Sequence, residues 1–160
     1  MRKSIFLTGV ILWVPFLTAY ITHPTKAEPT PQPIIPIQPT PIKTDSLVTA
    51  LIQVESRGND SAYCKSEEAV GCLQIRPIMV REVNRILKIQ GKENRFKLKD
   101  RWDREKSLEM FYVWKGFHHS NSTNEQIARN WNGGPKGHQR KSTIKYWAKV
   151  EQQLNQDGKN

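Results

Sequence analysis

The chain has 160 residues and a formal net charge of +10 at pH 7. This length suits one compact domain with an appended leader, and the charge favours an anionic partner. Nucleic acid is not the expected partner, because the sequence has no zinc-ligand spacing, no basic region followed by heptads and no RNA-binding aromatic signature. Envelope polymers that carry carboxylates or phosphates are the remaining class.

The N-terminus has the pattern of a secretory signal peptide. Residues 1–3 carry positive charge, residues 5–21 contain no charged side chain, and small side chains follow at positions 25 and 27. We therefore predict that residues 1–27 are a signal peptide or, if they are not cleaved, an inner-membrane anchor through residues 5–21. Both outcomes place the following domain outside the cytoplasm, in the periplasm or the extracellular space.

Residues 28–44 are rich in proline. Because proline fixes φ and lacks an N–H donor, we expect a disordered linker with extended polyproline II character rather than part of a core. The rest of the chain then divides into a domain at residues 45–155 and a polar tail at residues 156–160.

A short amphipathic helix is predicted at residues 47–58. Asp45 or Ser46 can accept a backbone N–H bond at its start, and Gly58 can take the left-handed conformation that ends a helix. The apolar face of this helix determines how the next candidate residue is placed.

Glu55 lies on that apolar face. Val48, Leu51 and Ile52 precede it by seven, four and three positions, so the four side chains share one side of the helix. A carboxylate beside aliphatic side chains loses hydration, which raises its pKa and lets it hold a proton near neutral pH. We predict that Glu55 is the general acid of a glycoside-cleaving enzyme; a solvated or ion-paired glutamate is the alternative.

Cys64 and Cys72 stand at the two ends of a polar loop. Two cysteines eight positions apart in an exported protein predict a disulfide, whereas they would supply only half of a zinc site. Glu67 and Glu68 lie between them and form either a solvated acidic patch or a source of a second catalytic carboxylate.

Helical periodicity dominates the remainder, so the predicted fold class is mainly α with at most a short β-ribbon at residues 63–75. The expected helices are one at 78–90 after Pro77, an almost entirely apolar central one after Asp103, and one from Ser122 or Thr123 to Trp131. A last helix is expected at about 143–154, with Ile144, Trp147, Ala148 and Leu154 on one side and Tyr146 and Val150 close by. His118 and His119 are adjacent on a helix and point apart, so we expect no metal site there.

Four sequence blocks resemble, in order, the lytic transglycosylases of the soluble-transglycosylase (SLT) type, which share the goose-type lysozyme fold. Glu55-Ser56 matches the catalytic Glu-Ser pair of that family, and residues 71–77 are similar to its Gly-Leu-Met-Gln-Ile-x-Pro segment. Residues 131–135 are similar to its Tyr-Asn-x-Gly-Pro loop, and Tyr146 begins a stretch similar to its last block. The chain departs from the pattern at Cys72, which replaces an apolar residue, and at Trp131, which replaces tyrosine.

The resemblance implies cleavage of the β-1,4 bond between N-acetylmuramic acid and N-acetylglucosamine in peptidoglycan. Glu55 would protonate the glycosidic oxygen and then, as a base, take the proton of the muramyl 6-hydroxyl, which gives a 1,6-anhydro product without metal or organic cofactor. Gln74 and Asn132 would hydrogen-bond sugar groups, and Tyr146 would hydrogen-bond Glu55 and orient it. Ser56 would either contact the glycan or pack behind the helix end.

Two alternatives remain open at this point. A water-positioning carboxylate from Glu67 or Glu68 would make the protein a hydrolysing muramidase, and a domain that keeps the fold without cleavage would be a cell-wall-binding module. The sequence equally suits remodelling of the cell's own wall, service to a secretion or conjugation apparatus, or attack on other cells.

Overall fold

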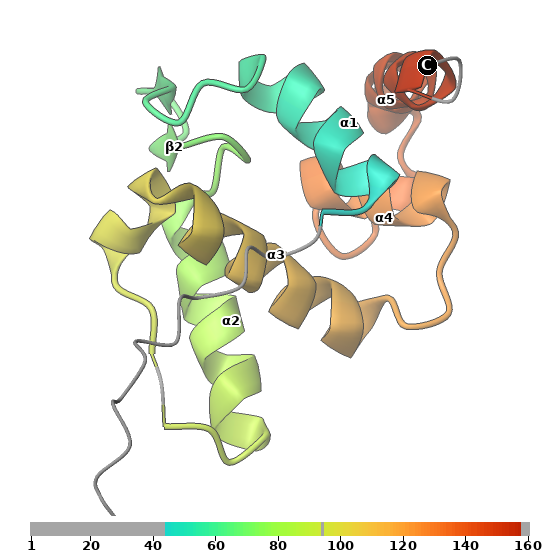
Figure 1. Cartoon of the computed structure of the whole chain (residues 1–160). Coiled ribbons are helices and arrows are strands. Elements are labelled where there is room, and N and C mark those ends of the chain that lie inside the picture. Colours follow the sequence, from blue (N-terminus) through green and yellow to red (C-terminus); the bar gives the residue numbers. More distant parts are fainter. Residues whose placement is uncertain (1–43, 94, 158–160) are drawn as a thin grey trace, which may run out of the picture. The chain divides into compact units, whose positions relative to one another are not determined.

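The structure is a computed structural model that describes residues 44–93 and 95–157 (Figure 1). The predicted leader at residues 1–27 and all but the last residue of the predicted linker lie outside the described residues. The described chain is mainly helical, with helices α1 (Ser46–Ser56), α2 (Pro77–Ile89), α3 (Arg104–His118), α4 (Asn124–Gly133) and α5 (Ile144–Asp157). It also contains strands β1 (Tyr63–Cys64) and β2 (Ala69–Val70) and the short 3-10 helices η1 (Leu98–Trp102), η2 (Gly137–Gln139) and η3 (Lys141–Thr143). Among the helices described, none combines the length and the apolar character needed to cross a membrane.

The core is built around α3, which runs through the middle of the domain (Figure 1). Met110 and Phe111 of α3 are fully buried, and the rings of Phe111 and Trp114 contact that of Trp131 in α4 edge-on. Helix α2 packs against α3, while α1 and α4 pack against α5. The predicted central position of the apolar helix is confirmed.

The helix ends follow the capping chemistry that the sequence predicts, with one correction. Asp45 accepts a bond from the Val48 backbone N–H, and Thr123 caps α4. The prediction that Gly58 ends the first helix was one residue late: Arg57, with φ 56°, is the C-cap, and Gly58 follows with φ 81°. The left-handed turn therefore begins on a residue with a side chain, and the glycine continues it.

The predicted ribbon is present as the antiparallel pair β1 and β2. Tyr63 lies opposite Val70 and Cys64 opposite Ala69, and Val70 also bridges to Ile75. This hairpin forms one wall of the domain beside the C-terminal end of α1.

The predicted disulfide between Cys64 and Cys72 is wrong, because both cysteines are free in the structure. Cys64 pairs with Ala69 across the hairpin, and its Sγ lies 3.3 Å from Oγ of Ser66. Cys72 is buried in the hydrophobic core, where burial raises the pKa of its thiol to about 11. The hairpin register thus gives the two side chains separate environments, which their spacing in the sequence does not reveal.

The last helix buries only part of the predicted side, together with the neighbouring Tyr146 and Val150. Val150 is fully buried, and Tyr146, Trp147 and Leu154 pack partly buried against the core. Ile144, which was expected to face inward, is exposed. The contact with α1 selects the side that carries Tyr146 and Val150, four residues apart.

Candidate active site

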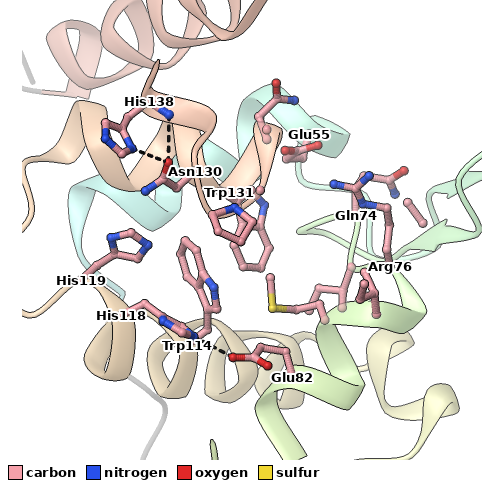
Figure 2. A pocket seen from close by; sticks show the side chains of 18 of the residues that line it. Glu55, Gln74, Arg76, Glu82, Trp114, His118, His119, Asn130, Trp131 and His138 are labelled. Carbon is pink, nitrogen blue, oxygen red and sulfur yellow. Dashed lines mark hydrogen bonds and ion pairs between the residues drawn. The ribbon is translucent and has the colours of Figure 1, made fainter. Parts of the chain in front are cut away.

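A cleft of about 990 Å³ lies among the end of α1, the hairpin, the start of α2, the end of α3, and α4 with the turn that follows it. Figure 2 shows its side chains in three groups: Glu55, Gln74 and Arg76 at one end, Trp114 and Trp131 in the middle, and His118, His119, Asn130 and His138 at the other end. The volume and the mixture of aromatic and polar walls suit a ligand of several rings.

Glu55 lies in the last turn of α1, where the apolar face of that helix reaches the cleft. Desolvation raises the pKa of its carboxyl from the ordinary 4.5 to about 7. A hydrogen bond from Tyr146 and the positive charge of Arg76 oppose this increase, and the negative charge of Glu67 adds to it. The carboxyl therefore holds a proton in a substantial fraction of molecules at neutral pH.

Tyr146 supports Glu55 from outside the cleft lining. Its hydroxyl donates to Oε1 of Glu55 at 2.7 Å, across 91 positions of sequence. Burial and the neighbouring Glu55 raise the pKa of Tyr146 well above 10, so it remains a donor. The hydrogen bond expected between these two residues is present.

Gln74 lines the cleft on the turn after β2, with a left-handed φ of 47°. Its amide nitrogen donates to the carbonyls of Ala62 and Gly71, at 3.1 and 3.0 Å. These two bonds fix the turn and leave the side-chain oxygen of Gln74 to accept a bond from a ligand. The side chain of Gln74 is thus held in place by backbone carbonyls of the hairpin segment.

Ser56 does not join the site. Its hydroxyl donates to the Ile52 carbonyl of its own helix at 3.2 Å, and it is absent from the cleft lining. Of the two roles considered for Ser56, the structure matches the one behind the helix end.

Asn132 lines the cleft and is exposed, in the final turn of α4. The neighbouring Asn130 is buried, and its Oδ1 accepts bonds from the backbone N–H and from Nδ1 of His138, both at 2.9 Å. Asn130 thereby holds the chain after α4 against the helix. Sequence reasoning missed Asn130, although its position three residues after Ile127 on the buried face of α4 was a usable signal.

Three further carboxylates lie near the site. Glu67 lines the cleft with its side chain 58% exposed, and one of its oxygens is 3.6 Å from Nη1 of Arg76. Glu68 is exposed and does not line the cleft. Glu82, which the sequence did not single out, lines the cleft and lies 2.7 Å from Nε2 of His118.

The histidine end of the cleft is bound to protein partners. Nδ1 of His119 lies 3.0 Å from Oγ of Ser122, and burial lowers the pKa of His119. Within residues 44–93 and 95–157, no three His, Cys, Asp or Glu side chains are arranged to hold a metal ion.

A mainly helical domain with a two-stranded hairpin, and with a desolvated carboxyl in its cleft, is consistent with the lysozyme-like class of helical folds. A family model described as the transglycosylase SLT domain matches residues 39–153, and the chain belongs to this family. The family supports a transglycosylase-type function that acts on peptidoglycan. No curated protein sequence matches the chain.

Proposed function

We propose that the protein is a peptidoglycan lytic transglycosylase in which Glu55 acts first as an acid and then as a base. The observation that carries this proposal is the carboxyl of Glu55, desolvated at one end of the cleft with a pKa of about 7. A general acid is most effective when its pKa lies near the working pH, because it is then both protonated and able to release its proton.

The reaction breaks the bond between C1 of N-acetylmuramic acid and O4 of N-acetylglucosamine. Glu55 gives its proton to O4, which leaves with the electron pair of the broken bond. The muramyl 6-hydroxyl then attacks C1 and gives its proton to the carboxylate of Glu55. The products are a 1,6-anhydro-muramyl end and a free 4-hydroxyl, and Glu55 returns to its protonated form.

Tyr146 serves as a positioning residue in this scheme. Its bond occupies Oε1 of Glu55, which leaves Oε2 for the substrate. The same bond stabilises the carboxylate that forms after the first proton transfer. Because Tyr146 does not line the cleft, it keeps this contact without touching the glycan.

Sugar contacts are assigned to Gln74 and Asn132, which line the cleft. The free side-chain oxygen of Gln74 can accept from a hydroxyl or acetamido N–H, and the exposed amide of Asn132 can donate and accept. Trp114 and Trp131 supply the apolar middle of the cleft.

The hydrolytic alternative requires a second carboxylate that positions water. The candidate in the cleft wall, Glu67, is mostly exposed and faces Arg76, which suits a solvated ion pair better than a water-positioning base. Mass spectrometry of muropeptides from digested sacculi distinguishes the two reactions. We expect 1,6-anhydro ends; hydrated reducing ends would establish the muramidase instead.

A wall-binding module without catalysis is the rival from another class. The Glu55→Gln variant, with its fold checked by circular dichroism, is expected to lose clearing of purified sacculi that the unmodified protein performs. If the unmodified protein binds sacculi but releases no fragments, the binding module is the better account.

Export is proposed because residues 1–27 have the pattern of a signal peptide. It also agrees with the proposed substrate, since peptidoglycan lies outside the cytoplasmic membrane. Cell fractionation of the full chain tests it: the protein should appear in the periplasm, the medium or the inner membrane. Recovery in the cytoplasm would contradict the proposed location.

A further inference from the structure

Tyr63 of β1 and Trp102 of η1 form an aromatic pair on the outside of the domain. Their ring centroids are 6.2 Å apart with an angle of 42° between the planes, and the residues are 58% and 44% exposed. Leu98, at the start of η1, is exposed as well. We propose that this aromatic pair is a second binding site for the glycan of peptidoglycan, an inference that rests on the proposed substrate of the cleft.

A buried arginine holds the two elements of the pair together. Arg101 is 8% exposed, and its Nη1 donates to the carbonyls of Glu68 and Ile75 at 2.7 and 2.9 Å. Its Nε donates to the Leu98 carbonyl within η1 at 2.9 Å. The guanidinium therefore fastens η1 to the hairpin segment and fixes Trp102 beside Tyr63.

The backbones of the two elements also approach closely. A side chain at Gly71, just after β2, would place its Cβ 2.1 Å from the Arg101 carbonyl oxygen, so only glycine fits there. The same carbonyl accepts a bond from the buried hydroxyl of Ser107 in α3, at 3.0 Å. Trp102 thus extends from a rigid anchor, which reduces the entropy lost when a ligand binds.

Burying this arginine has a cost in free energy. The hydrogen bonds of Arg101 to Leu98, Glu68 and Ile75 all end on neutral carbonyls. Burial lowers the pKa of its guanidinium, and the negative charge of Glu68 opposes that change. Desolvating a cation whose hydrogen-bond partners are neutral carries a free-energy penalty, which the charge of Glu68 offsets only in part. The arrangement adds no large side chain to the core, because Tyr63 and Trp102 remain on the surface. It does give the surface a fixed pair of aromatic rings.

A glycan is the occupant that the surroundings favour. Cys64, next to Tyr63 in β1, and Ala69, opposite Cys64, both line the catalytic cleft, so one hairpin serves the cleft and the aromatic pair. Successive strand residues point to opposite faces, which directs Tyr63 outward. Sugar rings present C–H faces that pack on aromatic rings while their hydroxyls remain in water, and Trp and Tyr suit such half-wet contacts. Lys65 and Lys99 are exposed nearby in sequence and match the acidic groups of the wall.

The binding test uses the full chain carrying Glu55→Gln, so that cleavage does not consume the ligand, and insoluble sacculi as the probe. We expect Trp102→Ala and Tyr63→Ala each to weaken co-sedimentation with sacculi about tenfold, and Trp102→Phe to weaken it less. Ile89→Ala is the matched control, because Ile89 is a similarly exposed apolar residue at the end of α2. The inference is overturned if Trp102→Ala and Tyr63→Ala, with unchanged thermal unfolding, bind as tightly as the parent, or if Ile89→Ala loses as much.

A second assay separates this site from the proposed reaction. With Glu55 intact, Trp102→Ala should cleave a short soluble muramyl tetrasaccharide at the parent rate and clear sacculi more slowly. Equal rates on both substrates would overturn the aromatic site and leave the transglycosylase proposal standing. Binding to sacculi that depends on Trp102, in a protein that cleaves neither substrate, would support the site and defeat the proposed reaction.

Discussion

Glu55 and Glu82 line the same cleft and have opposite protonation behaviour. Burial raises the pKa of Glu55 to about 7, whereas hydrogen bonds from Arg85 and His118 lower the pKa of Glu82 to about 2. The residue type and the cleft are shared, so burial and the local partners make the difference. Glu55 has one neutral donor, Tyr146, while Glu82 has two bonds from the guanidinium of Arg85 and lies against His118.

The comparison shows which physical effect determines each carboxyl. At Glu55 desolvation exceeds the combined effect of Tyr146 and Arg76. At Glu82 the hydrogen bonds and charges of Arg85 and His118 exceed the desolvation. A carboxyl that can be either acid or base near pH 7 is therefore found at only one of these two positions.

The largest expected difference is in activity. Glu55→Gln removes the proton donor and should lower kcat/KM on sacculi by roughly 10² to 10⁴. Glu82→Gln removes an ion pair and should leave kcat/KM within about threefold. Rates of fragment release, measured for both variants under the same conditions, test this prediction. An equal loss in both variants would contradict the assignment of Glu55 as the proton donor.

Stability should depend on pH in opposite directions at the two sites. Because the folded pKa of Glu55 is raised, its contribution to stability is present below pH 4.5 and is lost as pH rises towards 7. Glu55→Gln should therefore unfold like the wild type at pH 4 and be more stable at pH 8, by at most about 3 kcal/mol. For Glu82, with a lowered pKa, the contribution is present above pH 4.5 and is lost as pH falls towards 2.

Chemical denaturation of both variants at several pH values measures these effects. Glu82→Gln should be destabilised at pH 7 and approach the wild type near pH 2. A Glu55→Gln variant no more stable than the wild type at pH 8 would mean that the carboxyl is well solvated.

Removing the Tyr146 hydroxyl should have a smaller effect. The hydroxyl stabilises the charged form of Glu55, so Tyr146→Phe should raise the pKa of Glu55 and move the falling limb of the kcat/KM profile to higher pH. We also expect kcat to fall about tenfold, because the carboxyl loses its orientation. A profile that keeps its shape while kcat falls would indicate that the bond orients Glu55 without influencing its protonation.

The smallest effects should come from the pair at the cleft wall. Arg76 lowers the pKa of Glu55 and Glu67 raises it. Arg76→Gln should shift the falling limb of kcat/KM upward, and Glu67→Gln should shift it downward, each by roughly a few tenths of a pH unit. Shifts of the same sign would contradict the electrostatic assignment.

Local patterns in the sequence were enough to place Glu55. The spacing of Val48, Leu51 and Ile52 showed that Glu55 faces inward, and desolvation followed from that face. The sequence also narrowed two helix caps to Asp45 or Ser46 and to Ser122 or Thr123, because capping depends on residues three or four positions away; the structure has Asp45 and Thr123.

Contacts between distant residues were not readable in this way. The hairpin pairs Cys64 with Ala69 and accompanies the burial of the β2 residues Ala69 and Val70, while Cys72 lies beyond the pairing in the core. The burial of Arg101 depends on the carbonyls of Glu68 and Ile75, which are distant in sequence, and no local pattern indicates it. The partnership of Tyr146 with Glu55 was suggested by a family resemblance, since no local rule relates residues 91 positions apart.

The most direct test of the central claim is a titration of the Glu55 side-chain carboxyl, followed by its ¹³C chemical shift and assigned by its absence in Glu55→Gln. We predict a single inflection at about pH 7. An inflection near the ordinary value of 4.5 would show that Glu55 is a solvated base at neutral pH and would contradict its role as the proton donor.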